Sequence, residues 1–411
     1  MKHYDLIVLG GGIAGVGAAV SAAREGMKVL LAEKFGSLGG AMSNSLVYPF
    51  MRHYYRIENG KVKVMLSAGI FTEMKERKEK YGDDSWETFK FVFDDMVTEA
   101  GVEVLFHASV FSAKVESGRI KSVDVATKSG VMTFSADYYI DASGDGELMA
   151  MSGCEYLLGR ETDGYCQPMT TCFRLAGVDL ERFRAEEDEL QEIYKKYREE
   201  NKITNPRENI LCFYGPGKGI LHLNTTRIIK HDPTDPFQIS RAEMLARKQI
   251  VEMVDFLKKH SKALERASIV SIANHIGVRE SRKLVGVHVL NAEELRSCVK
   301  FEDSIALGNY DIDIHNPTGT GTYIYSFENG TYYSIPYRSL VPKEITNLLV
   351  AGRCLSADHE AHSAVRIMPI CACLGEAAGV AAAIAKKSGC DVQKVDTHLL
   401  RETLMQKGAK V

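Results

Sequence analysis

A glycine-rich segment near the N-terminus constrains the fold of this chain more than any other feature. Residues 10–15 read Gly-Gly-Gly-Ile-Ala-Gly and contain the pattern Gly-x-Gly-x-x-Gly. The pattern follows an apolar run over residues 4–9 and precedes a run of small residues over 16–25, and a second apolar run covers residues 28–33. Short apolar runs favour strands, and the small-residue run favours a helix. We therefore predict a strand–helix–strand unit with parallel strands and a tight turn after the first strand.

This unit predicts a dinucleotide-binding site. The N–H groups and the dipole at the start of a helix can receive a pyrophosphate. Glu33 ends the second strand, 18 residues after Gly15, and a carboxylate at this place accepts hydrogen bonds from a ribose diol. Because it would repel a 2′-phosphate, the pattern favours FAD or NAD over NADP.

Other segments favour FAD over NAD. Gly39-Gly40 follows Glu33 closely and suits a loop beside the remaining pyrophosphate and ribityl chain of a longer cofactor. A strand end at 138–140 leads into Asp141-Ala-Ser-Gly-Asp-Gly146, a turn of small residues that lets a cofactor approach the backbone. No second glycine motif of this kind follows a predicted strand, so we expect no dedicated NAD(P)H domain.

The middle of the chain differs in character from both ends. A highly charged helix is predicted over residues 180–200, and Ser240 and Glu243 form a capping box that predicts the start of a second long helix. Towards the C-terminus, an apolar strand is predicted over 347–351 and an Ala/Gly-rich helix over 368–386. These last elements are expected to return to the first sheet.

We therefore predict an α/β fold with two domains. A Rossmann-like, discontinuous FAD-binding domain comprises residues 1–155 and 340–411. An inserted α+β domain, residues 156–339, is expected to cap the cofactor and hold the substrate.

Seven ordered motifs, spread over nearly the whole chain, carry a resemblance to a known family. They are Gly10–Gly15 with Glu33, Gly39-Gly40, Asp141–Gly146, Gly277-Val-Arg-Glu-Ser-Arg282, Asp313-Ile-His-Asn-Pro317, Ile335-Pro-Tyr-Arg-Ser-Leu340, and Leu349-Val-Ala-Gly-Arg353 through Arg366-Ile-Met-Pro369 to Gly375. With them the chain resembles bacterial FAD-dependent oxidoreductases of the glutathione-reductase-type (two-dinucleotide-binding) flavoprotein superfamily, in the branch similar to fumarate reductase and succinate dehydrogenase flavoproteins.

The resemblance implies a set of cofactor-binding residues. Those expected beside the adenosine, pyrophosphate and ribityl parts of FAD are Gly10, Gly12, Ile13, Ala14, Gly15, Glu33, Lys34, Gly39, Gly40, Ala41, Met42, Ser43, Val110, Ala142, Ser143 and Gly144. Gly352, Arg353 and Pro369 are expected near the flavin ring. Two residues depart from the family pattern, since Ser143 stands where threonine is frequent and Glu376 where glutamine is frequent. We expect Glu376 to place a negative charge near the flavin end of the last helix.

The expected chemistry is hydride transfer at the flavin N5, assisted by groups that move a proton or hold an oxyanion. His315 and Asn316 are the first choice for substrate contact, although a loop histidine bonded to backbone fits the sequence equally well. The other catalytic candidates are His359, His362, Arg338 and Arg366.

Two further patterns in the sequence bear on this chemistry. Asp358-His-Glu-Ala-His362 does not match the His-Glu-x-x-His zinc motif, so no metal site is predicted. Arg279 and Arg282 fit either a carboxylate-binding pair or a structural salt-bridge network with Glu280.

Composition narrows the partners and the compartment. The net charge is -3, from 51 basic and 54 acidic residues, with no basic block that would indicate nucleic acid. Nine cysteines, an odd number without any Cys-x-x-Cys, indicate reduced thiols and a cytoplasmic protein. Residues 6–23 lack charge but contain five glycines, so we assign them to the Rossmann unit. No segment after residue 23 is expected to be long and apolar enough to cross a bilayer, and we expect no membrane-spanning segment.

The sequence thus predicts an FAD-dependent oxidoreductase, a dehydrogenase or reductase, acting on a small-molecule substrate with an electron donor or acceptor still to be identified. Three alternatives stay open. They are a flavin-dependent hydroxylase using NAD(P)H and oxygen, a non-catalytic FAD-binding protein, and an NAD-binding protein.

Overall fold

A seven-stranded sheet brings the turn-forming segments of the sequence to one edge. The computed structural model describes residues 2–215 and 217–411. Strand β1 (Lys2–Leu9) lies between β2 (Val29–Ala32) and β8 (Gly130–Asp141), and both pairs are parallel. β19 (Leu348–Val350) runs parallel to the end of β8. Four strands therefore end side by side, and the turns that follow them meet.

The remaining strands extend this sheet on both sides. β5 (Glu103–Leu105) pairs with β2, and the antiparallel strands β7 (Arg119–Thr127) and β6 (Ser109–Glu116) follow β8. The predicted strands over 102–106, 110–116, 119–126 and 131–141 are thereby confirmed to within one or two residues.

Two helices of small residues pack closely on this sheet. Helix α1 (Ile13–Arg24) begins three residues earlier than predicted and crosses α10 (Met368–Ser388). A Cβ atom on Gly375 would lie 2.0 Å from the carbonyl oxygen of Ala14. Only glycine permits this approach, which holds the start of α10 beside the glycine turn.

Helix α10 resembles a membrane-spanning helix in its length and apolar composition. It is long and apolar enough to cross a bilayer, but 94% of its most apolar window is buried inside the fold. The expectation that no segment after residue 23 has this length and composition is therefore wrong. Its apolar character is explained by its position in the core, against α1 and the sheet.

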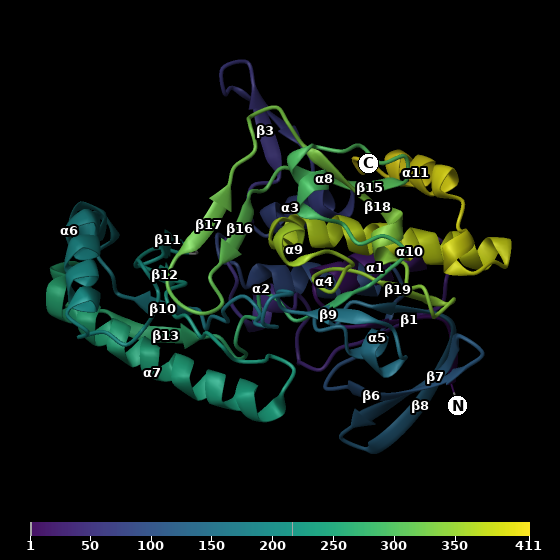
Figure 1. Cartoon of the computed structure of the whole chain (residues 1–411), viewed down its shortest axis with the longest axis horizontal. Coiled ribbons are helices and arrows are strands. Elements are labelled where there is room, and N and C mark those ends of the chain that lie inside the picture. The colour runs from purple at the N-terminus through teal and green to yellow at the C-terminus, as the bar shows by residue number, and fades with distance from the viewer. Residues whose placement is uncertain (1, 216) are drawn as a thin grey trace.

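A second sheet and two long helices form a separate layer, seen at the lower left of Figure 1. The sheet has the order β11-β12-β10-β13, and α6 (Leu180–Glu199) and α7 (Pro236–His260) pack on it. Their shared apolar core draws its members from residues 173–267. The strands are β10 (Phe173–Ala176), β11 (Cys212–Tyr214), β12 (Leu221–Leu223) and β13 (Ser268–Ile272).

The segment after this layer shares a core with the N-terminal region. Leu290, Ile305, Ile335 and Leu340 belong to the same apolar cluster as α1 and α10. The domain boundaries at 155 and 340 stay a prediction, because a shared core does not by itself define a domain border.

The capping box predicted at Ser240 and Glu243 was wrong. Helix α7 begins at Pro236, and its cap is Asp235, whose carboxylate accepts hydrogen bonds from the N–H groups of Phe237 and Gln238. Ser240 lies inside the helix and donates to the carbonyl of Pro236. Asp235 followed by proline is the better start signal, because proline at the first helical position sacrifices no hydrogen bond.

Shorter elements connect these layers. Helices are α2 (Ala41–Asn44), α3 (Ile70–Lys80), α4 (Thr88–Glu99), α5 (Glu147–Met151), α8 (Ala292–Arg296), α9 (His359–Val365) and α11 (Thr397–Gln406), with 3-10 turns at Lys262–Leu264, Tyr337–Leu340 and Val392–Lys394. Strands are β3 (Tyr54–Ile57), β4 (Val62–Met65), β9 (Tyr156–Leu158), β14 (Arg282–Leu284), β15 (Ser304–Gly308), β16 (Ile312–His315), β17 (Thr322–Tyr325) and β18 (Tyr333–Pro336).

Candidate active site

A cavity of about 590 Å³ starts at the edge where the parallel strands end and extends towards the second sheet. Its first half is walled by the turns after β1, β2, β8 and β19 and by the start of α10. Its second half is walled by side chains from residues 207–213, 275–279 and 310–324. The cavity thus joins the predicted cofactor region to the predicted substrate region.

The glycine turn is built to approach a ligand with its backbone. Gly10 has a φ of +93°, and a Cβ there would lie 2.5 Å from the carbonyl oxygen of Ala142. Gly12 caps α1 without any side-chain hydrogen bond, and Gly12, Ile13 and Ala14 line the cavity. The first N–H groups of α1 therefore face the cavity without a side-chain acceptor, as a pyrophosphate requires.

The side chain of Glu33 holds this turn by a hydrogen bond to its backbone. Its Oε2 accepts a hydrogen bond of 2.5 Å from the N–H of Gly11, and its Oε1 accepts one of 2.8 Å from Phe35. The side chain is buried but borders the cavity. Each carboxylate oxygen keeps a second lone-pair direction, so the residue can hold the turn and still accept from a ribose.

The turn after β8 is fixed by a buried carboxylate. Asp141 Oδ1 accepts from the N–H and the hydroxyl of Ser143, and Oδ2 accepts from the N–H of Met149. Burial raises the pKa of Asp141 above its ordinary value, partly offset by these hydrogen bonds. Ser143 keeps the hydroxyl that threonine supplies in the family pattern, and this hydroxyl is used within the turn.

Arg353 joins this turn to the one after β19. Its Nη2 donates to Asp145 Oδ1 at 2.8 Å. Burial alone would raise the pKa of Asp145, but the positive charges of Arg353 and Lys34 lower it to about 2. A carboxylate that stays ionised keeps both turns joined at neutral pH.

Most predicted cofactor-binding residues border the cavity. These are Gly10, Gly12, Ile13, Ala14, Glu33, Lys34, Gly39, Gly40, Ala41, Met42, Val110, Ala142, Ser143, Gly144, Gly352 and Arg353. Gly15, Ser43 and Pro369 lie behind the wall. Gly15 serves packing, since a Cβ there would lie 1.8 Å from the carbonyl oxygen of Gly10. The residues present therefore fit FAD, and their individual roles stay predictions.

Three arginines border the other half of the cavity, and of these Arg207 is buried while Arg279 and Arg366 are half-buried. Arg279 donates to the carbonyl of Pro168 and the hydroxyl of Thr170, and Arg207 donates to Asn209 Oδ1. Arg366 lines the cavity with its Nε lacking any partner among the described residues. Burial, with the nearby charges of Arg366 and Arg207, lowers the pKa of Arg279 to about 9.

His315 lies in this half, held on both ring nitrogens. Its Nδ1 accepts from Arg227 Nη2 at 3.2 Å, and its Nε2 lies 3.5 Å from Asp313 Oδ2. Asp313 also accepts from the hydroxyl of Tyr310 at 2.9 Å. Burial and the charge of Arg279 lower the pKa of His315 to about 3, so the ring is neutral with its proton on Nε2.

Asn316 is not among the residues that line the cavity. Its amide donates to the carbonyl of Thr320, and its Oδ1 accepts from the N–H of Thr318. The side chain therefore shapes the turn between β16 and β17, and the structure does not join it to His315 as a substrate contact.

Three other catalytic candidates also lie outside the cavity. His359 Nδ1 donates to the buried Glu280, and His362 Nε2 donates to the carbonyl of Arg353. Arg338 pairs with Asp303. Of the predicted catalytic residues, only His315 and Arg366 border the cavity.

The sequence matches the family of FAD dependent oxidoreductases over residues 5–404. The chain belongs to this family. The predictions of a Rossmann-like α/β fold, of FAD as cofactor and of an FAD-dependent oxidoreductase are thereby confirmed.

Other relatives of this FAD-dependent oxidoreductase match over shorter stretches. Glutathione reductase of Debaryomyces hansenii is 40% identical over 92 residues, 22% of this chain and 18% of that protein. Glutathione reductase of Schizosaccharomyces pombe is 28% identical over 184 residues, 40% of this chain and 36% of that protein. The chain thus spans well under half the length of these relatives.

Among solved structures, a geranylgeranyl bacteriochlorophyll reductase-like protein of Thermoplasma acidophilum is similar, with a TM-score of 0.47 and 13% identity. The similarity covers 99% of this chain and 84% of that chain.

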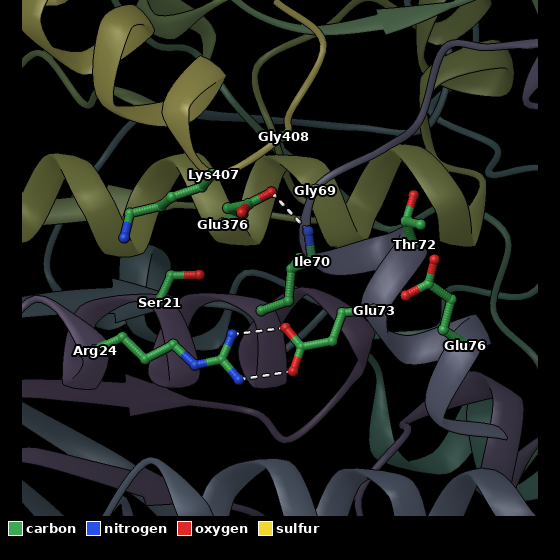
Figure 2. Close-up of a pocket in the computed structure, with 10 residues that line it drawn as sticks. All are labelled: Ser21, Arg24, Gly69, Ile70, Thr72, Glu73, Glu76, Glu376, Lys407 and Gly408. Atoms are coloured by element: carbon green, nitrogen blue, oxygen red, sulfur yellow. Dashed lines mark hydrogen bonds and ion pairs between the residues drawn. The ribbon is translucent and has the colours of Figure 1, made fainter. Parts of the chain in front are cut away.

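Glu376 does not lie where the family pattern led us to expect it. It is absent from the cofactor cavity and lines a separate cavity of about 270 Å³ between α1, α3 and α10. Figure 2 shows its carboxylate reaching the start of α3, where Oε2 accepts from the N–H of Ile70 at 3.1 Å. Burial raises the pKa of Glu376 to about 7. The expected negative charge near the flavin end of the helix is therefore corrected to a carboxyl group that anchors the start of α3.

Sequence reasoning missed several residues of the cavity. Tyr48, Arg207, Tyr310 and Asp313 border it, and the first three stand in segments without a recognisable pattern. Asp313 begins one of the family motifs, which was a usable signal. Arg207 and Tyr48 reach the cavity from loops far away in the sequence, and no local spacing indicates them.

Proposed function

We propose that this FAD-dependent oxidoreductase transfers a hydride between a small organic anion and the flavin N5. One observation carries this proposal. Among the described residues, no carboxylate lies within salt-bridge distance of Arg207, Arg279 or Arg366, and Arg279 is bonded only to neutral acceptors. A guanidinium that is partly removed from water and has no anionic partner is costly, and a substrate carboxylate of the right shape would relieve that cost.

The three arginines would bind and orient the anion. Bidentate hydrogen bonds from a guanidinium fix the plane of a carboxylate and hence the direction of the carbon that reacts. Bound FAD would supply the hydride acceptor or donor at N5. The side chains of Tyr48 and Phe213 line the same cavity and would exclude water from the substrate.

Asp313, His315 and Tyr310 would form a polar wall beside the anion site. Although burial alone would raise the pKa of Asp313, His315 and Arg366 lower it well below its ordinary value. The carboxylate therefore stays ionised and holds the Nε2–H of His315 and the hydroxyl of Tyr310. His315 in this proposal orients substrate as a neutral hydrogen-bonding group, which keeps its predicted role as a substrate contact.

The remaining expectations belong to the same proposal. We keep as proposals the similarity to the fumarate reductase and succinate dehydrogenase branch and a separate electron donor or acceptor. We also keep the expectation that neither nucleic acid nor a membrane is a partner. All nine cysteines are free thiols, which supports the predicted cytoplasmic location.

The first experiment is a visible spectrum of the protein purified without added cofactor, repeated on the supernatant after acid precipitation. Release of a yellow flavin would be followed by anaerobic bleaching with carboxylic acids, their uncharged amides, sugars and amines. We expect carboxylates to bleach the flavin at least about 100-fold faster than their amides, because a charged hydrogen bond to a partly buried arginine is worth several kcal/mol.

Two matched variants test the arginine site. Arg279→Gln should abolish this preference while the flavin content stays unchanged. Arg282→Gln removes the same charge three residues away, outside the cavity lining, and should keep the preference. Equal bleaching by acids and amides would refute the anion site. Rapid oxygen-consuming oxidation of NAD(P)H would indicate the hydroxylase alternative, and a flavin that no compound bleaches would indicate a non-catalytic role.

A further inference from the structure

Helix α7 presents an unusual row of exposed side chains along the outer edge of the molecule. In Figure 1 it runs along the lower left margin, with α6 and the second sheet on one side only. Phe237 is 74% exposed, Met244 55% and Val251 57%. Large apolar side chains with this exposure on one helix face indicate an interaction surface.

The exposed residues follow the spacing of a coiled-coil seam. Successive members of the row are separated alternately by four and three residues, the 3.5-residue period at which one helix can contact another along its whole length. All seven are exposed, and the row extends for about 30 Å at 1.5 Å per residue. The members of the row are Phe237, Arg241, Met244, Lys248, Val251, Asp255 and Lys258.

The row is complementary to itself when it is reversed. Reversal about Lys248 places Arg241 opposite Asp255 and brings Met244 within one residue, about 1.5 Å along the axis, of Val251. It also brings Phe237 within one residue of Lys258, a pair that can form a cation–π contact. Only Lys248 meets its own copy. A two-fold symmetric contact requires a surface that is complementary to its own reversed copy. This row meets the requirement, because reversal pairs a positive with a negative side chain and an apolar with an apolar one.

We infer that α7 is the contact between two copies of this chain, packed antiparallel across a two-fold axis near Lys248. Within the chain, among the described residues, Arg241 and Asp255 form no salt bridge or side-chain hydrogen bond, so both charges are free to pair across the axis. The axis repeats every pair twice. Two Arg241–Asp255 pairs and two Met244–Val251 contacts would then flank the central lysines.

This arrangement predicts a dimer of modest affinity. A single helix pair is smaller than the interfaces of permanent dimers, and the exposed charge pairs are weakened by salt. The dimer should therefore form in the micromolar range and dissociate as ionic strength rises. The contact lies on the outer edge of the molecule and includes no residue that lines the cofactor cavity.

Sedimentation of the FAD-loaded protein from about 1 to 100 µM tests the inference. Arg241→Asp and Asp255→Arg should each raise the dissociation constant at least about tenfold, because each reversal turns two attractive pairs into repulsive ones. The double variant restores the pairs with opposite polarity and should return close to the original value. Lys195→Asp, an equal charge change on the exposed side of α6, should leave the constant unchanged.

A second measurement covers the apolar contacts. Met244→Glu should also dissociate the dimer, with circular dichroism and flavin content equal to the wild type. A protein that is monomeric over the whole range would overturn the inference. So would a dimer that is unaffected by Arg241→Asp, or one that the double charge reversal fails to restore.

Discussion

Glu376 makes the stability of this protein depend on pH in a direction opposite to that of most carboxylates. Its side chain is 3% exposed, and burial raises its pKa from 4.5 to about 7, with Glu73 acting in the same direction and Lys407 and Arg24 opposing it. The folded protein therefore keeps a proton that the unfolded chain releases above pH 4.5. Stability from this group is full below pH 4.5 and is lost as pH rises to about 7.

The size of the effect follows from the two pKa values. The difference between 4.5 and about 7 corresponds to about 3 kcal/mol, because one pKa unit is worth about 1.4 kcal/mol. Glu376→Gln cannot ionise, and its amide oxygen can still accept from the N–H of Ile70. We expect the variant to match the wild type near pH 4.5 and to exceed it by about 3 kcal/mol near pH 8.

Urea unfolding at several pH values measures this directly, with the single tryptophan, Trp86, as the fluorescent reporter. Glu76→Gln is the matched control, since Glu76 lines the same cavity but is exposed, and it should keep the wild-type pH dependence. A Glu376→Gln variant with an unchanged pH dependence, or one that is less stable than the wild type at pH 8, would refute the reasoning.

Two other predictions concern packing and titration. Gly375→Ala should destabilise the protein by about 3 kcal/mol or more, because the backbones of α1 and α10 would have to separate. This cost outweighs the roughly 1 kcal/mol that alanine adds in helix propensity. Gly319→Ala is the control and should change the urea midpoint little, because a Cβ there would lie 3.7 Å from its nearest atom. The rate of flavin bleaching by substrate should show no titration near pH 6.5, since the pKa of His315 is lowered to about 3. A bleaching rate that falls by half across that pH would show that His315 gains a proton in the functional range.

Sequence patterns predicted those parts of the fold that depend on neighbours in the chain. The strands flanking the glycine turn and the Ala/Gly-rich helix were found because the period and the turn residues are local signals. The second sheet was missed because β11 and β12 have only three residues each, too few to show an alternation. The start of α7 was misplaced because two capping signals compete within five residues, and Asp235 with Pro236 is the stronger.

The candidate site also has one half that local sequence patterns predicted and one half that they did not. The cofactor half is built from turns, whose glycines and carboxylates are visible as motifs, and sixteen of the predicted cofactor-binding residues border the cavity. The substrate half is built from single side chains. Arg207 is a loop residue, Arg279 belongs to another segment and Arg366 follows the last residue of α9, and nothing in their local sequences shows that they converge.

The fate of the predicted histidines shows why residue type alone could not assign this chemistry. His315, His359 and His362 have the same side chain, and burial sets the pKa of His315 and His362 below its ordinary value. What distinguishes them is their partners. A backbone carbonyl takes the proton-bearing nitrogen of His362, the buried Glu280 takes that of His359, and only His315 combines a cavity position with an ionised neighbour. Because those partners come from distant segments, the functional difference between the three histidines is created by the fold.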